Sequence, residues 1–151
     1  MIRPARRGSH GFTLMELLIA LTIVALLAAV ALPSYQSAIC KVRRAEGKSA
    51  LLRLMQQQEQ VYTQRISYVA FSASSLGPDG QLFKWFSGTS PATSSYEIEG
   101  VACQGSHIAN CVLLVAHPGT AQVNRNFSDP ACGALRLDSE GRTGADGNGC
   151  W

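Results

Sequence analysis

The feature that most constrains this chain is an unbroken apolar stretch close to its start. Residues 12–32 contain one charged side chain, Glu16, and neither proline nor glycine. As an α-helix these residues would be roughly 32 Å long, about the thickness of the hydrocarbon core of a bilayer. A helix that is apolar on all sides must lie in a membrane or against other apolar helices.

Basic residues precede the apolar stretch. Three of the 13 lysines and arginines, and none of the 10 acidic residues, come before residue 12. The net charge of +3 therefore belongs to these first residues, because the rest of the chain has 10 basic (13 minus 3) and 10 acidic side chains. The basic start predicts an N-terminus held in the cytoplasm. The neutral remainder does not favour nucleic acid as a partner.

The cysteines indicate an oxidising compartment. Cys103, Cys111, Cys132 and Cys150 lie near the C-terminus, which after an export-type start is typical of two disulfides. Four cysteines allow three pairings. We favour Cys103–Cys111 and Cys132–Cys150, because such short loops close at little entropic cost. For the fifth, Cys40, a semi-buried thiol in a helix is favoured over an intermolecular bridge.

Three interpretations of the N-terminus follow. A secretory signal would be cut after the A-x-A pattern of residues 29–31 and leave a soluble product beginning at Leu32. An uncleaved anchor would keep the chain in the membrane. Cleavage after Gly11 would keep the apolar helix and free the amino group of Phe12. Only the third interpretation gives Glu16 a partner, the free N-terminus of a neighbouring subunit, and an unpaired carboxylate in hydrocarbon is costly.

Residues 11–16, Gly-Phe-Thr-Leu-Met-Glu, resemble the processing site of type IV pilins and pseudopilins. The resemblance implies that a prepilin peptidase cuts after Gly11 and methylates the new N-terminal Phe12. It also implies that Glu16 contacts the N-terminus of an adjacent subunit. A helix kink or unwound turn is expected at Pro33, because proline removes one backbone hydrogen bond.

The fold that this resemblance implies is α+β, the type IV pilin fold. In it, a long N-terminal α-helix packs on a small antiparallel β-sheet with a disulfide-bounded C-terminal loop. We expect a cleaved basic leader (1–11), a transmembrane and assembly helix (12–32), an amphipathic continuation of the helix (33–64) and a periplasmic globular domain (65–151).

The residue pattern agrees with this fold. Apolar residues at helical spacing predict the amphipathic continuation, with a polar face at 56–60 and a weak point at Gly47. The predicted apolar stripe comprises Tyr35, Ala38, Ile39, Val42, Leu51, Leu54, Met55, Val61 and Tyr62. Strands are predicted at 95–102, 111–116 and 133–138, and they need the helix to pack against.

Residues 66–91 are predicted to form a mainly irregular connection with a turn at 77–80. The side chains expected to enter the core from it are Phe71, Leu76, Phe83, Trp85 and Phe86. The C-terminus, from Cys132-Gly to Cys150-Trp151, resembles that of PilE-type minor pilins. We expect Trp151 to fill the core.

The sequence offers no pattern for catalysis, so we expect a substrate of processing enzymes and not an enzyme, with no cofactor and no metal. Cys103, His107 and Cys111 have the spacing of part of a zinc site, but a fourth ligand is not evident and a disulfide is favoured. An acidic, Gly-rich loop resembles a calcium loop but does not match the EF-hand spacing, so a solvated turn is favoured. Its oxygen-bearing residues are Asp138, Glu140, Asp146 and Asn148.

The expected function is that of a minor type IV pilin, a structural subunit incorporated into or priming a pilus for adhesion or twitching motility. Its expected partners are prepilin peptidase, other pilin subunits in a homo- or hetero-filament and, before assembly, the inner membrane. A single membrane pass would leave the C-terminal domain in the periplasm and later in the extracellular pilus.

Two alternatives remain open at this point. One is a pilin-like DNA receptor for natural transformation, for which the basic residues of the C-terminal half would have to converge. These residues are Lys84, Arg125, Arg136 and Arg142. The other is a type II secretion pseudopilin, against which the two disulfides argue mildly.

Overall fold

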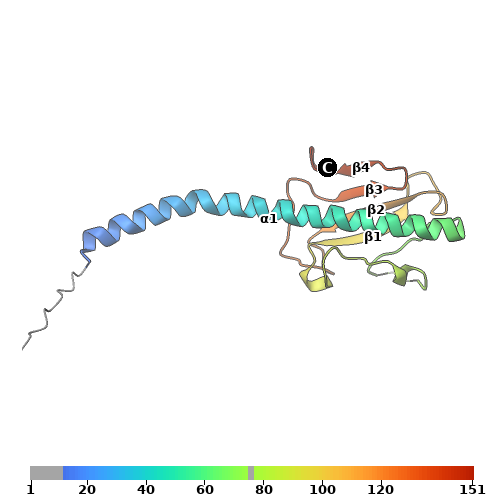
Figure 1. Ribbon diagram of the computed structural model, residues 1–151, viewed down its shortest axis with the longest axis horizontal. Helices are drawn as coiled ribbons and strands as arrows, with labels where there is room; N and C mark the ends of the chain where they lie inside the picture. Colours follow the sequence, from blue (N-terminus) through green and yellow to red (C-terminus); the bar gives the residue numbers. More distant parts are fainter. Residues whose placement is uncertain (1–11, 75–76) are drawn as a thin grey trace, which may run out of the picture. The chain divides into compact units, whose positions relative to one another are not determined.

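The computed structural model describes residues 12–74 and 77–151, and these fall into two compact units that divide between Ala38 and Ile39. One helix, α1 (Leu14–Arg65), supplies the first unit and continues into the second (Figure 1). The predicted leader, Met1 to Gly11, lies outside the described residues. We call the second unit, Ile39–Trp151, the globular unit.

α1 remains helical through both positions at which the sequence suggested a disturbance, Pro33 and Gly47. The kink at Pro33 stays a prediction. Gly47 does not interrupt the helix, and a Cβ there would lie 3.0 Å from Cδ2 of Tyr96 and 3.4 Å from Cδ1 of Leu135. The missing side chain therefore lets α1 lie directly on the ring of Tyr96.

The buried face of α1 is confined to its later turns. Ala50, Leu51 and Leu54 are buried in the core, whereas Val42 of the predicted stripe is 67 % exposed. The prediction for the polar face was wrong at Gln58, which is 0 % exposed.

Gln58 is buried because its amide meets the backbone of the connection that follows α1. Its Nε2 donates to the carbonyl oxygen of Val69 at 2.7 Å, and the amide N of Val69 donates to its Oε1 at 3.0 Å. A buried polar group is tolerated when its hydrogen bonds are made in this way.

The sheet consists of four antiparallel strands in the order β1-β2-β3-β4, and the later turns of α1 lie across it (Figure 1). The strands are β1 (Tyr96–Ala102), β2 (Val112–Pro118), β3 (Leu135–Asp138) and β4 (Thr143–Ala145). The three predicted strands and the α+β architecture are confirmed. β4 was missed, because its three residues, Thr-Gly-Ala, carry no apolar alternation.

The core lies between the sheet and α1. Inward-facing residues alternate along β1, where Tyr96 and Ile98 are 0 % exposed. Leu114 and Leu135 continue this layer on β2 and β3. The period of two in burial is that of a sheet with one face on a core.

The connection between α1 and β1 is mainly irregular, as predicted, with short 3₁₀ turns at Gly80–Leu82 and Pro91–Thr93. It also pairs with the edge strand β1 through two isolated β-bridges, Phe71 with Gly100 and Phe86 with Glu97. Phe71 and Phe83 are buried and stacked, with centroids 5.1 Å apart. Trp85 and Phe86 are half-buried, and Leu76 lies outside the described residues.

Trp151 does not fill the core, contrary to prediction. Its side chain is 38 % exposed, and its indole N–H donates to the carbonyl oxygen of Gly144 in β4. The Lys48 ammonium lies 5.4 Å from the ring centroid. The C-terminal tryptophan thus covers the outer edge of the sheet.

Candidate functional site

The start of α1 holds the residues predicted for processing and assembly. Gly11 lies outside the described residues, and Phe12 is 86 % exposed. The backbone N and Oγ1 of Thr13 both donate to Oε2 of Glu16 at 2.9 Å, and the backbone N of Glu16 donates to Oγ1 of Thr13 at 3.2 Å. These reciprocal bonds form a capping box, which satisfies backbone groups at a helix start.

The capping box changes the interpretation of Glu16. In the isolated chain its carboxylate is already engaged by the helix of its own subunit. The signal for it, Thr13-x-x-Glu16, was present in the sequence but was not among the features that we identified there. Both bonds from Thr13 go to Oε2, so a contact of Glu16 with a second subunit can use Oε1 or replace the bonds to Thr13.

The first unit otherwise presents an apolar surface. α1 is long and apolar enough to cross a membrane, with a mean hydropathy of 2.6 in its most apolar window and none of that window buried within the chain. Because Leu14, Leu17, Leu18 and Ile19 are all more than half exposed, this surface needs lipid or other helices to cover it.

The cysteines form the two local pairs favoured from the sequence, Cys103–Cys111 and Cys132–Cys150. The first closes the connection between β1 and β2, and the second ties the start of β3 to the C-terminus. Cys40 is half-buried, as expected, and lies outside both disulfides; the preference for a thiol over a bridge between subunits stays a prediction. With both of its cysteines in a disulfide, the Cys103–Cys111 segment has no thiolates to offer zinc.

The acidic loop near the C-terminus is held by its own hydrogen bonds. Oδ1 of Asp138 accepts the backbone N–H groups of Glu140 and Arg142, and its Oδ2 accepts Nε of Arg142 at 2.6 Å. Burial opposes the charge of Asp138, but the bonds from Arg142 outweigh it and hold its pKa below the usual value. These contacts are those of a turn, but the prediction that the turn is solvated was wrong at Asp138, which is 7 % exposed.

A buried polar cluster joins α1 to the loop that precedes β3. Nε and Nη2 of Arg44 donate to the two carboxylate oxygens of Asp129 at 2.8 and 2.7 Å, and the hydroxyl of Tyr96 donates to Oδ2 at 2.8 Å. The Asp129 side chain is 0 % exposed and that of Arg44 15 %. We call Arg44, Tyr96 and Asp129 the helix–loop clamp.

The clamp shifts the ionisation of its members. Burial alone would raise the pKa of Asp129, but the hydrogen bonds from Arg44 and Tyr96 outweigh it, so the pKa lies below its usual value. Burial, assisted by the bond to Asp129, raises the pKa of the Tyr96 phenol. Sequence reasoning missed this cluster, because Arg44 and Asp129 are 85 positions apart.

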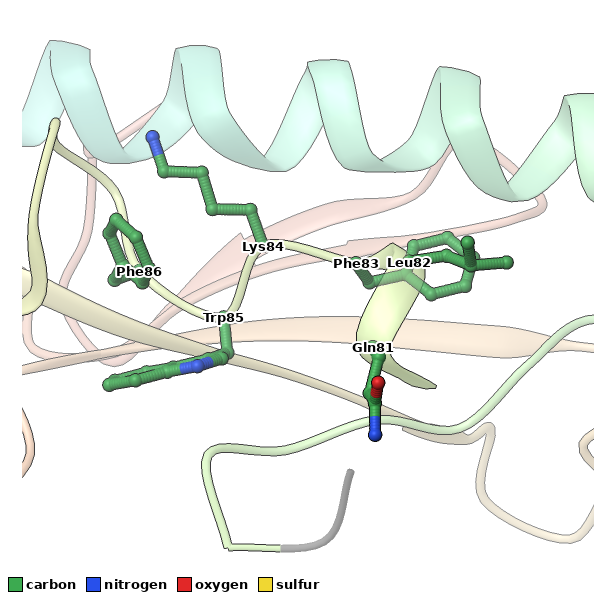
Figure 2. A pocket seen from close by; sticks show the side chains of 6 residues that line it. All are labelled: Gln81, Leu82, Phe83, Lys84, Trp85 and Phe86. Carbon is green, nitrogen blue, oxygen red and sulfur yellow. The ribbon is translucent and has the colours of Figure 1, made fainter. Parts of the chain in front are cut away.

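A second polar group of residues lies where the α1–β1 connection passes α1. A hollow of about 200 Å³ opens there, with a floor formed by buried residues of the helix. Its lining consists of Ala50, Arg53, Leu54, Gln57, Lys84 and Phe86. A second hollow, of about 410 Å³, shares Lys84 and Phe86 and is lined by residues 81–86 (Figure 2).

The side chains around these hollows combine cations with aromatic rings. Lys84 extends toward α1 with its ammonium 4.8 Å from the Phe86 ring centroid, and it donates to the carbonyl of Gly88 (Figure 2). Trp85 meets Phe86 edge to face, with centroids 5.1 Å apart. We call Arg53, Lys84, Trp85 and Phe86 the basic–aromatic surface.

The cations of this surface are not paired with acids. Among the described residues, neither Arg53 nor Lys84 lies within ion-pair distance of a carboxylate. Arg136 and Arg142, by contrast, are paired with Asp146 at 2.7 Å and with Asp138. Of the four basic residues named for a DNA receptor, only Lys84 joins a basic surface, and its neighbour there, Arg53, was not among them.

The comparisons with known proteins now define the class. Residues 6–32 match the prokaryotic N-terminal methylation motif. Residues 33–136, more than half of the chain, match the family described as "Type IV minor pilin ComP, DNA uptake sequence receptor". The two matches together cover residues 6–136, and the chain belongs to this family of type IV minor pilins.

A solved structure is also similar to the chain. It is the crystal structure of the Neisseria meningitidis non-core minor pilin PilV, at 18 % sequence identity. The similarity covers 75 % of this chain and 92 % of that one, with a TM-score of 0.49.

Proposed function

We propose that the chain is a pilus subunit that prepilin peptidase cuts between Gly11 and Phe12 and methylates at the new N-terminus. The match of residues 6–32 to the methylation motif and the exposed position of Phe12 at the start of α1 support this. Residues 12–32 then anchor the subunit in the inner membrane, with the globular unit in the periplasm. On assembly, the exposed apolar surface of the helix exchanges lipid for the helices of other pilin subunits.

In this proposal Glu16 sets the position along the helix at which neighbouring subunits pack in the filament. The carboxylate enters an apolar surrounding, where an unpaired charge is costly. The positively charged N-terminus of a neighbouring subunit offsets that cost. In the unassembled subunit, the Thr13 hydroxyl and backbone N–H donate hydrogen bonds to the carboxylate at the helix start. The charge is therefore oriented before assembly.

Two substitutions of Glu16 separate its charge from its capping role. Glu16→Gln keeps a side chain able to complete a capping box but removes the charge, and Glu16→Val removes both. We expect both variants to accumulate in the membrane fraction of the native host and to be absent from sheared pili, as measured by immunoblot. Normal incorporation of Glu16→Gln would overturn the charge-pairing role and leave only the capping box.

We further propose that the globular unit binds DNA at the basic–aromatic surface. The family match over residues 33–136, whose description is that of a DNA uptake sequence receptor, supports this over adhesion or twitching motility. The observation that carries it is that Arg53 and Lys84 line one hollow with Phe86 and have no carboxylate within ion-pair distance among the residues that the structure describes. A phosphate can contact these two groups without first displacing an acid.

Salt dependence tests this proposal. Each phosphate contact contributes about −0.9 to the slope of log K against log salt concentration on duplex DNA. The double variant Arg53→Ala with Lys84→Ala should therefore bind duplex DNA more weakly and reduce that slope by about 2. The full chain in detergent, titrated against labelled duplex by fluorescence anisotropy, provides the measurement.

Arg125→Ala is the matched control. Arg125 is an exposed cation of the globular unit that lines neither hollow. Because this variant removes one charge and the double variant removes two, a slope reduced by about 1 and half the loss of binding free energy would mean that binding follows net charge and not the basic–aromatic surface. Failure of the unaltered chain to bind duplex DNA at low salt would overturn the DNA-receptor function itself.

A further inference from the structure

The smaller hollow of the basic–aromatic surface has an apolar floor and an aromatic wall, which phosphate binding alone does not require. Phosphates are bound by cations and N–H groups at an open surface. Here the floor is apolar and buried, with Ala50 and Leu54 each 4 % exposed. Phe86 forms one wall and Arg53 and Lys84 contribute two positive charges. An apolar slot with an aromatic wall and cations has the chemistry for a nucleobase together with its own phosphate.

Gln57 adds a polar group at the same place. Its Nε2 donates to the carbonyl oxygen of Leu82 at 2.8 Å, which fixes the orientation of the amide. Gln57 is a lining residue of the hollow, and its Oε1 has no partner among the described residues. The amino group of a base is a suitable donor to such an oxygen.

We infer that this hollow is a subsite for one unpaired nucleotide, an inference that rests on the proposed DNA-receptor function. The base lies against Phe86 over the apolar floor, and the phosphate of the same nucleotide binds Arg53 and Lys84. To do so, the Lys84 ammonium gives up its hydrogen bond to the carbonyl of Gly88. A base inside a duplex reaches such a slot only by being unpaired and unstacked, which costs free energy. The subsite therefore favours DNA that already has unpaired bases, such as a strand end.

The experiment compares DNA molecules of one sequence that differ only in their ends. The full chain in detergent is titrated with a closed circular duplex, a blunt linear duplex, a linear duplex with a single-stranded tail and the single strand. We expect the tailed duplex and the single strand to bind about tenfold more tightly than the closed circle, as stacking on one aromatic residue allows. A 2-aminopurine in the tail should change its fluorescence on binding.

Phe86→Leu is the variant that tests the assignment. Leucine keeps an apolar side chain at this half-buried position but lacks an aromatic face, and near-UV circular dichroism checks that the variant is folded. We expect Phe86→Leu to bind tailed and closed DNA with equal affinity and to lose the 2-aminopurine signal. Arg125→Ala should keep both.

The outcomes distinguish this inference from the function on which it rests. Equal binding of closed and tailed duplex by the unaltered chain would overturn the subsite and leave the DNA-receptor function standing. A preference for tailed DNA that survives Phe86→Leu would overturn the assignment to this hollow. No binding of any DNA would overturn the proposed function and the subsite together.

Discussion

Replacement of Arg44 by alanine should destabilise the globular unit strongly. Two of its guanidinium nitrogens, Nε and Nη2, lie 2.8 and 2.7 Å from the oxygens of Asp129, whose side chain is 0 % exposed. Removal of one member of a buried ion pair costs about 3–5 kcal/mol, because the remaining charge is left uncompensated. Asp129 keeps the bonds from Tyr96 and from the backbone N of Cys132, so we expect the lower end, about 3 kcal/mol.

This loss corresponds to a large change in the unfolding temperature. For a unit of about 100 residues, each kcal/mol lowers Tm by about 4–8 °C, so Arg44→Ala should lower it by about 12–24 °C. The assay is thermal unfolding of the full chain in detergent, followed by near-UV circular dichroism. This signal reports the packing of the aromatic side chains and not the helicity of the first unit.

The neighbouring Arg43 provides a matched control. Its Nη1 lies 3.2 Å from Oε2 of Glu46, but the side chains are 44 % and 28 % exposed, and such surface pairs contribute about 1 kcal/mol or less. Equal effects of Arg43→Ala and Arg44→Ala would refute the reasoning. So would strict additivity of Arg44→Ala and Asp129→Ala, because residues in one buried network should show a coupling of at least about 0.5 kcal/mol.

Three further predictions concern stability. First, the folded-state pKa of Asp129 is lowered, so its carboxylate contributes to the free energy of unfolding at pH values above the unfolded-state pKa of about 3.9. This contribution is lost as the pH falls through the folded-state pKa. Tm should therefore decline below about pH 4, and less steeply in Asp129→Asn. Second, replacement of Cys132 and Cys150 together by alanine should cost about 3 kcal/mol in urea unfolding, since their separation of 18 residues closes a loop of that length. Third, Ile66→Gly should raise Tm by about 4–8 °C, since Ile66 has a φ of 53° and is 77 % exposed, and glycine relieves about 1 kcal/mol of backbone strain.

Each of these predictions has an outcome that contradicts it. A Tm that is constant from neutral pH to about pH 2 would rule out a stabilising Asp129 carboxylate. No change in the urea midpoint without the Cys132–Cys150 bridge would mean that the bridge does not restrict the unfolded chain. A lower Tm for Ile66→Gly would show that the isoleucine side chain makes contacts worth more than the strain.

Much of the fold could be predicted because its signals are local. The helical spacing of apolar residues, the alternation along β1 and β3 and the short separations of the paired cysteines each depend on near neighbours in the chain. The capping box of Thr13 and Glu16 is of the same kind and was equally readable. β4 could not be predicted, because Thr143–Ala145 is a strand only through its pairing with β3.

The sequence by itself determined the apolar helix, the processing motif, the order of helix and strands and, with short loops as the guide, the two disulfides. Only the tertiary structure decided that Gln58 is buried, that Arg44 meets Asp129, that Trp151 lies at the sheet edge and that Arg53 stands beside Lys84. The physical reason is tertiary packing and not distance along the chain alone, since Arg44 and Asp129 are 85 positions apart but Trp151 and Gly144 only 7. Each of these contacts forms only when a connecting segment packs against α1 or the sheet, and side-chain type does not specify that partner in advance.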